Sequence, residues 1–97
     1  MTATRAFAAM FFVLSGAGIA LAADAPPGAA SCSGCHAANA RVETPVPPLA
    51  GRPAADIAAA MIAFKTGERK GTIMDRIAKG FSDDEIAAIA AWYATQK

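Results

Sequence analysis

The sequence predicts an all-α protein, because two stretches show helical periodicity and none shows the alternation typical of strands. Residues 41–53 contain four prolines, which excludes a regular helix or a central strand there. The chain has 97 residues, enough for one domain at most. Three to four short helices account for the pattern.

The clearest apolar periodicity predicts a helix over residues 54–66. Ile57, Met61 and Phe64 recur at i, i+4 and i+7, so they share one face. The stretch is bounded by residues that suit a first helical position and a helix stop, Pro53 and Gly67.

A capping box predicts the start of a last helix over about 83–96. Ser82 can accept a hydrogen bond from the backbone of Glu85, whose side chain reaches back to the cap. Shorter helical segments are predicted over about 29–36 and 74–79. The side chains predicted to be buried on the last helix are Ile86, Ile89, Ala90 and Tyr93.

Residues 1–22 are predicted to form a cleaved signal peptide, which leaves residues 23–97 as the mature domain. Arg5 precedes an apolar run that ends in small residues at Ala20 and Ala22, as a signal peptidase requires. A retained membrane anchor is the alternative, but the run is near the lower length limit for a spanning helix. Cleavage predicts a periplasmic protein with no membrane attachment.

The composition of the mature domain raises the question of what fills its core. Hydrophobic types make up 55% of the chain, yet 27 residues are alanine, and only 15 of the 75 residues in 23–97 are large apolar or aromatic ones. So small a domain needs disulfides, a metal or a cofactor to stabilise it. The net charge of +1 excludes the strongly basic surface of a nucleic-acid-binding protein.

Both cysteines and the only histidine lie in one motif, Cys32-Ser33-Gly34-Cys35-His36. This is the attachment pattern of haem c, in which two thiols add to the haem vinyl groups and the adjacent imidazole ligates the iron. A thioredoxin-like redox pair would need a βαβ setting, and a structural zinc would need a fourth ligand. A disulfide would close too short a loop to contribute much stability. We therefore predict one covalent haem c.

Methionine is the usual second axial ligand when a chain has no further histidine. Met74 follows a glycine-containing loop 38 residues beyond His36, so we predict it as that ligand. Met61 lies on an apolar stripe and is predicted to fill the core. An open site that binds a small ligand is the alternative. The other ring nitrogen of His36 is expected to donate to the carbonyl of Pro47 or Pro48, unless the proline segment is only a rigid loop.

With these motifs, residues 29–97 resemble the class I cytochromes c, in which three to four short helices wrap around one covalently bound haem. The shared pattern comprises Cys32-Ser-Gly-Cys-His36, Pro47-Pro-Leu-Ala-Gly51, Met74 and an aromatic last helix. The resemblance implies thioether bonds at Cys32 and Cys35, axial ligation by His36 and Met74, and an orienting carbonyl at Pro47. It also implies that Trp92 or Tyr93 packs the last helix near the haem and the first helix.

Residues 64–85 are similar to the methionine-ligand segment of the cytochrome subunit of flavocytochrome c sulfide dehydrogenase, above all in Thr72-Ile73-Met74 and in residues 76–80. The likeness implies a haem subunit, not itself an enzyme, that accepts electrons from an FAD-containing, sulfide-oxidising flavoprotein. The best-known members carry two haems, so with its one CxxCH motif this chain would be a single-haem form. One alternative is a free soluble c5- or c4-like shuttle between a membrane redox complex and a terminal acceptor. Another is a ligand sensor or haem enzyme in which Met74 is displaceable.

Residues 65–79 carry a local excess of three positive charges around Met74. Such a patch speeds the encounter with an acidic redox partner, and an ordinary solvated surface is the alternative. The charges are those of Lys65, Arg69, Lys70, Arg76 and Lys79 against Glu68 and Asp75.

Overall fold

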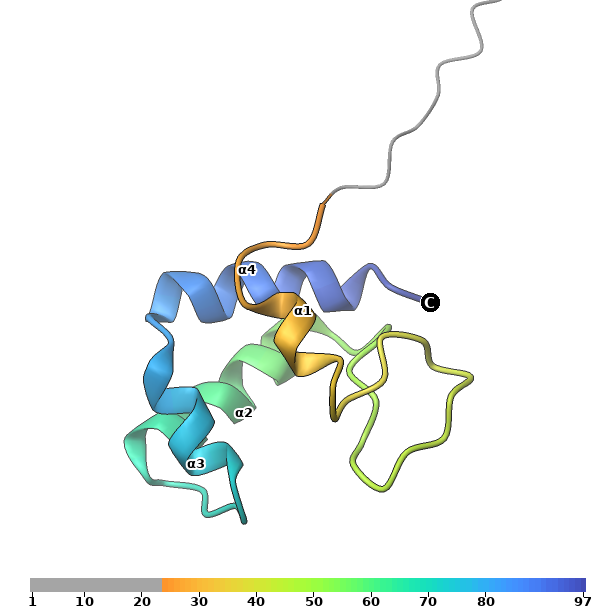
Figure 1. The fold of residues 1–97 in the computed structure, drawn as a ribbon. Coiled ribbons are helices and arrows are strands. Elements are labelled where there is room, and N and C mark those ends of the chain that lie inside the picture. The colour runs from red at the N-terminus through yellow and green to blue at the C-terminus, as the bar shows by residue number, and fades with distance from the viewer. Residues whose placement is uncertain (1–23) are drawn as a thin grey trace, which may run out of the picture.

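The computed structural model describes residues 24–97, so the predicted signal peptide lies outside the described residues. All regular structure within 24–97 is helical, which confirms the all-α prediction (Figure 1). None of the helices in this range is long and apolar enough to cross a bilayer. The elements are α1 (Ala29–Cys32), α2 (Ala54–Thr66), α3 (Met74–Ile77), the 3-10 helix η1 (Ala78–Gly80) and α4 (Asp83–Ala94).

The two long helices form where the sequence predicts them. Pro53 caps α2 instead of forming its first residue, and its carbonyl accepts the N–H groups of Asp56 and Ile57. Gly67 ends the helix with a φ of 81°, in the left-handed region that glycine adopts without strain. At the start of α4 both bonds of the capping box between Ser82 and Glu85 are present, each at 3.2 Å.

Two helices are shorter than predicted. α1 ends at Cys32, and successive i→i−3 hydrogen bonds then turn the chain toward His36. This turn contains Gly34, which has a weaker helix propensity than any residue of α1. α4 ends at Ala94, where the hydroxyl of Thr95 donates to the carbonyl of Trp92 at 2.7 Å and so takes the place of a helical partner.

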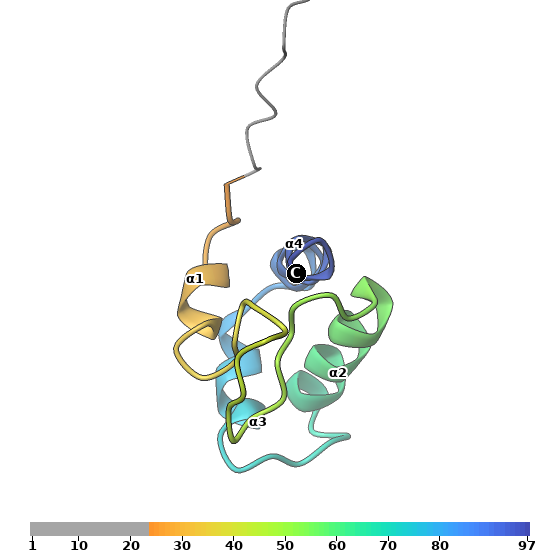
Figure 2. The same ribbon diagram turned by 90° about the vertical axis from the view of Figure 1, so that its right-hand side faces the viewer.

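The helices enclose a small core around α4. Figure 2 looks nearly along α4, with α1 on one side, α2 on the other and α3 below, and α2 packs against both α4 and α3. All four side chains predicted to be buried on α4 are buried, which confirms the predicted stripe. The central cluster consists of Ala29, Ile57, Ile89, Ala90 and Tyr93.

Gly28 allows α1 to approach the α4 side of the molecule closely. Its φ is 87°, and a Cβ atom there would lie 2.6 Å from Cε1 of Phe81 and 3.6 Å from Cδ1 of Ile89. A larger residue would therefore force α1 and Phe81 apart.

Candidate functional site

A cavity of about 420 Å³ lies between the helices, and its volume is within the range of roughly 300–1,000 Å³ found for ligand and cofactor sites. The four residues predicted to bind haem line its wall, although they come from separate parts of the chain: Cys32, Cys35, His36 and Met74. Most of the remaining wall is apolar, with contributions from α2 and α4 such as Ile57, Phe64 and Ile86. The cavity thus combines the haem-attachment motif with a large apolar surface.

His36 is held by the loop that follows α1. Its Nδ1 lies 2.6 Å from the carbonyl oxygen of Pro47. Because a carbonyl only accepts, Nδ1 carries the proton and donates, which leaves Nε2 unprotonated and able to bind a metal. Of the two carbonyls considered from the sequence, the structure brings that of Pro47, not that of Pro48, to His36.

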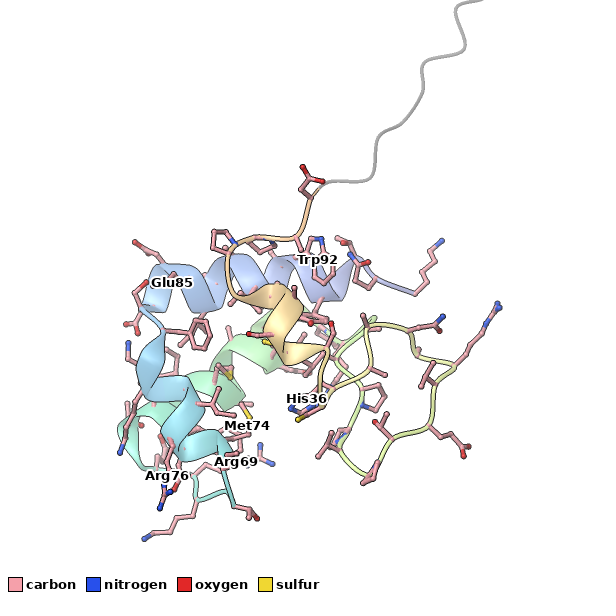
Figure 3. The ribbon with its side chains drawn as sticks, in the orientation of Figure 1. His36, Arg69, Met74, Arg76, Glu85 and Trp92 are labelled. Carbon is pink, nitrogen blue, oxygen red and sulfur yellow. The ribbon has the colours of Figure 1, made fainter. Side chains whose placement is uncertain are left out.

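Met74 is the first residue of α3 and reaches the cavity from the opposite side. Figure 3 shows its side chain and that of His36 pointing toward one another. Gly71 permits this placement, since a Cβ there would lie 2.9 Å from Cε1 of Phe64 and 3.4 Å from Cβ of Met74. The loop before α3 therefore passes directly over Phe64 and sets Met74 beside it.

Met61 lines the same cavity from α2. It shares a helical face with Ile57 and Phe64, both of which also line the cavity. The sequence periodicity identified the shared face correctly. It did not reveal that this face borders the cavity as well as the side-chain core to which Ile57 belongs.

The two cysteines differ in exposure, Cys32 being half-buried and Cys35 exposed. Burial raises the pKa of the Cys32 thiol, and a hydrogen bond with Ser31 opposes this effect only in part. Thiols that exchange disulfides have a lowered pKa, so the shift at Cys32 is in the opposite direction. Within residues 24–97, no three His, Cys, Asp or Glu side chains converge as they would in a zinc site.

Two arginines also line the cavity, Arg52 and Arg69. The guanidinium of Arg69 lies 4.8 Å from the centre of the Phe64 ring, a cation–π distance. From the sequence, Arg69 was predicted only as part of a surface charge cluster, and nothing was predicted for Arg52. No local pattern distinguishes them from other exposed arginines, because the cavity wall is assembled from segments far apart in the chain.

A family sequence model, described as cytochrome c oxidase, cbb3-type, subunit III, matches residues 28–92. The chain belongs to this cytochrome c family. The match extends from just before the attachment motif to Trp92 on α4, so it spans nearly all of the described cytochrome c fold. It confirms the resemblance to cytochromes c, and with the Cys32 and Cys35 spacing it confirms one covalent haem c.

Three curated relatives are similar to this cytochrome. It is 38% identical to the cytochrome subunit of sulfide dehydrogenase of Chlorobaculum tepidum over 63 residues, 65% of this chain and 57% of the relative. It is 35% identical to cytochrome c-554(548) of Halomonas halodenitrificans over 71 residues, 69% of this chain and 86% of the relative. It is 39% identical to the thiosulfate dehydrogenase electron acceptor of Stutzerimonas stutzeri over 67 residues, 65% of this chain and 31% of the relative.

The cytochrome therefore spans little more than half of the sulfide dehydrogenase subunit and about a third of the thiosulfate dehydrogenase acceptor. Of these relatives, two are named as cytochromes and one as an electron acceptor.

Proposed function

We propose that this cytochrome carries single electrons on a haem c bound by Cys32 and Cys35, with His36 and Met74 as the axial ligands. The observation that supports this most strongly is the apolar cavity that has all four side chains on its wall. Bound haem c supplies one-electron chemistry, because its iron is stable in both the ferric and the ferrous state.

The protein's own residues set the conditions for that chemistry. Pro47 fixes the orientation of the His36 ring through the bond at Nδ1, so Nε2 faces a constant direction. The thioether of Met74 is an uncharged ligand of the kind that raises the reduction potential. The apolar wall, including Leu49 and Ile86, excludes water and so disfavours the more highly charged ferric form.

The proposed electron donor is an FAD-containing, sulfide-oxidising flavoprotein. Support comes from the similarity to the cytochrome subunit of sulfide dehydrogenase and from the segment 64–85, which forms the Met74 side of the cavity. We place the cytochrome in the periplasm after removal of residues 1–22. The second candidate is a free electron shuttle, which is favoured by the match to 86% of cytochrome c-554(548).

Purification of the native holoprotein from its own cells distinguishes the two candidates. If the first is right, the haem band and flavin absorbance co-elute in constant ratio through size exclusion, and sulfide reduces the haem of that fraction. A haem-containing fraction of monomer size with no flavin supports the shuttle. Tight carbon monoxide binding by the reduced native protein would contradict both and favour a displaceable Met74.

Docking of the partner is proposed around α3, where the side chains of Ile73 and Ile77 are 58% and 39% exposed and also line the cavity. Lys65 is paired with Asp83 at 2.8 Å, so we exclude it from the docking charges. The remaining cations of this docking surface are Arg69, Lys70, Arg76 and Lys79.

Reversing single charges of the docking surface is expected to slow reduction by an acidic partner. Lys70→Glu and Lys79→Glu should each lower the bimolecular rate about threefold or more at low salt, because electrostatic steering is lost. High salt should abolish the difference by screening. Stopped-flow reduction measures both effects, with Lys97→Glu as the control, since the C-terminus lies far from α3 (Figure 1). Equal rates for all three variants would make this region an ordinary solvated surface.

A further inference from the structure

Two hydroxyl groups, one on the buried Tyr93 and one on the exposed Ser33, connect α4 to the haem-attachment motif. Tyr93 on α4 is fully buried, and its Oη donates to the carbonyl of Ala29 at 2.6 Å. The hydroxyl of Ser33 lies 2.7 Å from the same oxygen. Because Tyr93 has one proton and gives it to a carbonyl, Ser33 must be the donor of the second bond. Ser33 is the residue that directly follows Cys32 in the attachment motif.

The backbone of Tyr93 holds a second segment. Its carbonyl accepts the N–H of Gly51 at 3.0 Å. Gly51 lies four residues beyond Pro47, in the same proline-rich loop whose carbonyl at Pro47 fixes the ring of His36. A Cβ on Gly51 would lie 3.5 Å from the backbone oxygen of Gln96, so the loop also packs closely on the end of α4.

His36 is thus held from two sides, by the attachment motif before it and by the proline loop that binds its Nδ1. Both segments are tied to Tyr93, one through the side chain and one through the main chain. We propose that Tyr93, together with Ser33, is a positioning residue that keeps the proximal histidine in place and its side of the haem dry. The inference rests on the proposed His36 ligation and adds residues that lie outside the ligand set.

Removing the phenol hydroxyl deprives the Ala29 carbonyl of its donor and Ser33 of its acceptor. The phenol oxygen that is removed is buried in the parent protein. The attachment motif then loses its side-chain tie to α4 while the proline loop stays bound to the main chain. Water gains access between the two segments and favours the ferric form, so the reduction potential falls.

The test is an equilibrium redox titration of the holoprotein variants. Tyr93→Phe is expected to shift the ferrous-to-ferric equilibrium about threefold toward ferric, a fall of about 28 mV at 59 mV per tenfold for one electron. Ser33→Ala should give a smaller fall, because the bond between Tyr93 and Ala29 survives. Ser33→Thr, which keeps a hydroxyl, should restore the parent potential.

The reduction potential of the double variant Ser33→Ala/Tyr93→Phe should be no lower than that of Tyr93→Phe alone, because both changes remove the same hydrogen bond. Thr95→Val is the matched control: it deletes a hydroxyl at the same end of α4 that donates to Trp92 and does not contact the attachment motif. It should leave the potential unchanged.

Unchanged potentials in both Tyr93→Phe and Ser33→Ala would overturn the inference, even if the melting temperature falls. The near-infrared band of methionine-ligated ferric haem is recorded on the same samples. Its presence in the parent protein and in both variants shows that axial ligation is intact, so a failure of the positioning role is distinguished from a failure of the proposed ligand set.

Discussion

Replacing Met74 with alanine is expected to abolish the weak near-infrared absorbance of methionine-ligated ferric haem completely and to lower the reduction potential. Met74 begins α3 after a loop that Gly71 allows to pass over Phe64, and its side chain points toward His36 (Figure 3). Loss of the thioether leaves the iron without the ligand that favours the ferrous state. Absorption spectra of the oxidised holoprotein and a redox titration measure the two effects.

Met61→Ala is the control that this chain offers, because Met61 is its other methionine on the cavity wall. Its thioether belongs to the regular stripe of α2, so we expect the band to survive this change, with some loss of stability from the missing side-chain volume. Survival of the band in Met74→Ala, or its loss only in Met61→Ala, would show that the axial ligand has been assigned to the wrong methionine.

A Cys32→Ala/Cys35→Ala variant, which cannot hold haem covalently, is expected to be largely unfolded once haem is removed. The buried hydrophobic residues of the described chain are mostly alanines, and only Tyr93 and Ile86 are large side chains buried completely. Without haem, the apolar wall of the cavity of about 420 Å³ has no cofactor to pack against. A typical small domain is stable by only about 5–15 kcal/mol, so the loss of this packing is a large part of its stability.

Far-ultraviolet circular dichroism of the haem-free double variant tests this expectation. Ser33→Ala, purified with haem, is the control within the same motif, because it keeps both thiols and should remain helical. A native-like helical spectrum with a cooperative thermal transition in the haem-free double variant would mean that the polypeptide core is sufficient by itself, and would contradict the expectation.

The local features of the fold were predictable in detail. Gly67 and the pair Ser82 and Glu85 mark helix ends through interactions within a few residues, so their effect can be read from neighbours in the chain. The predicted C-terminal ends of α1 and α4 were wrong. At each end, backbone and side-chain donors compete for the last carbonyl groups of the helix. Sequence periodicity does not resolve that competition.

The site was predictable to the extent that its chemistry is local. Cys32, Cys35 and His36 form a motif of five residues, so the sequence by itself determined that this chain holds a haem c. It also identified Met74 as a candidate ligand and the proline loop as the segment near the histidine. These inferences need only residue types, spacing and the reach of a flexible chain.

Only the tertiary structure decided which groups meet over long sequence distances. In the structure, the carbonyl of Pro47 lies against His36, and Met61 lies on the cavity wall. Tyr93 contacts Ser33, which is 60 residues away in the sequence. A hydroxyl finds its partner through the packing of whole helices, and the pattern within one helix reveals only which face is buried. The sequence therefore determined the cofactor, and the tertiary structure determined which groups surround His36.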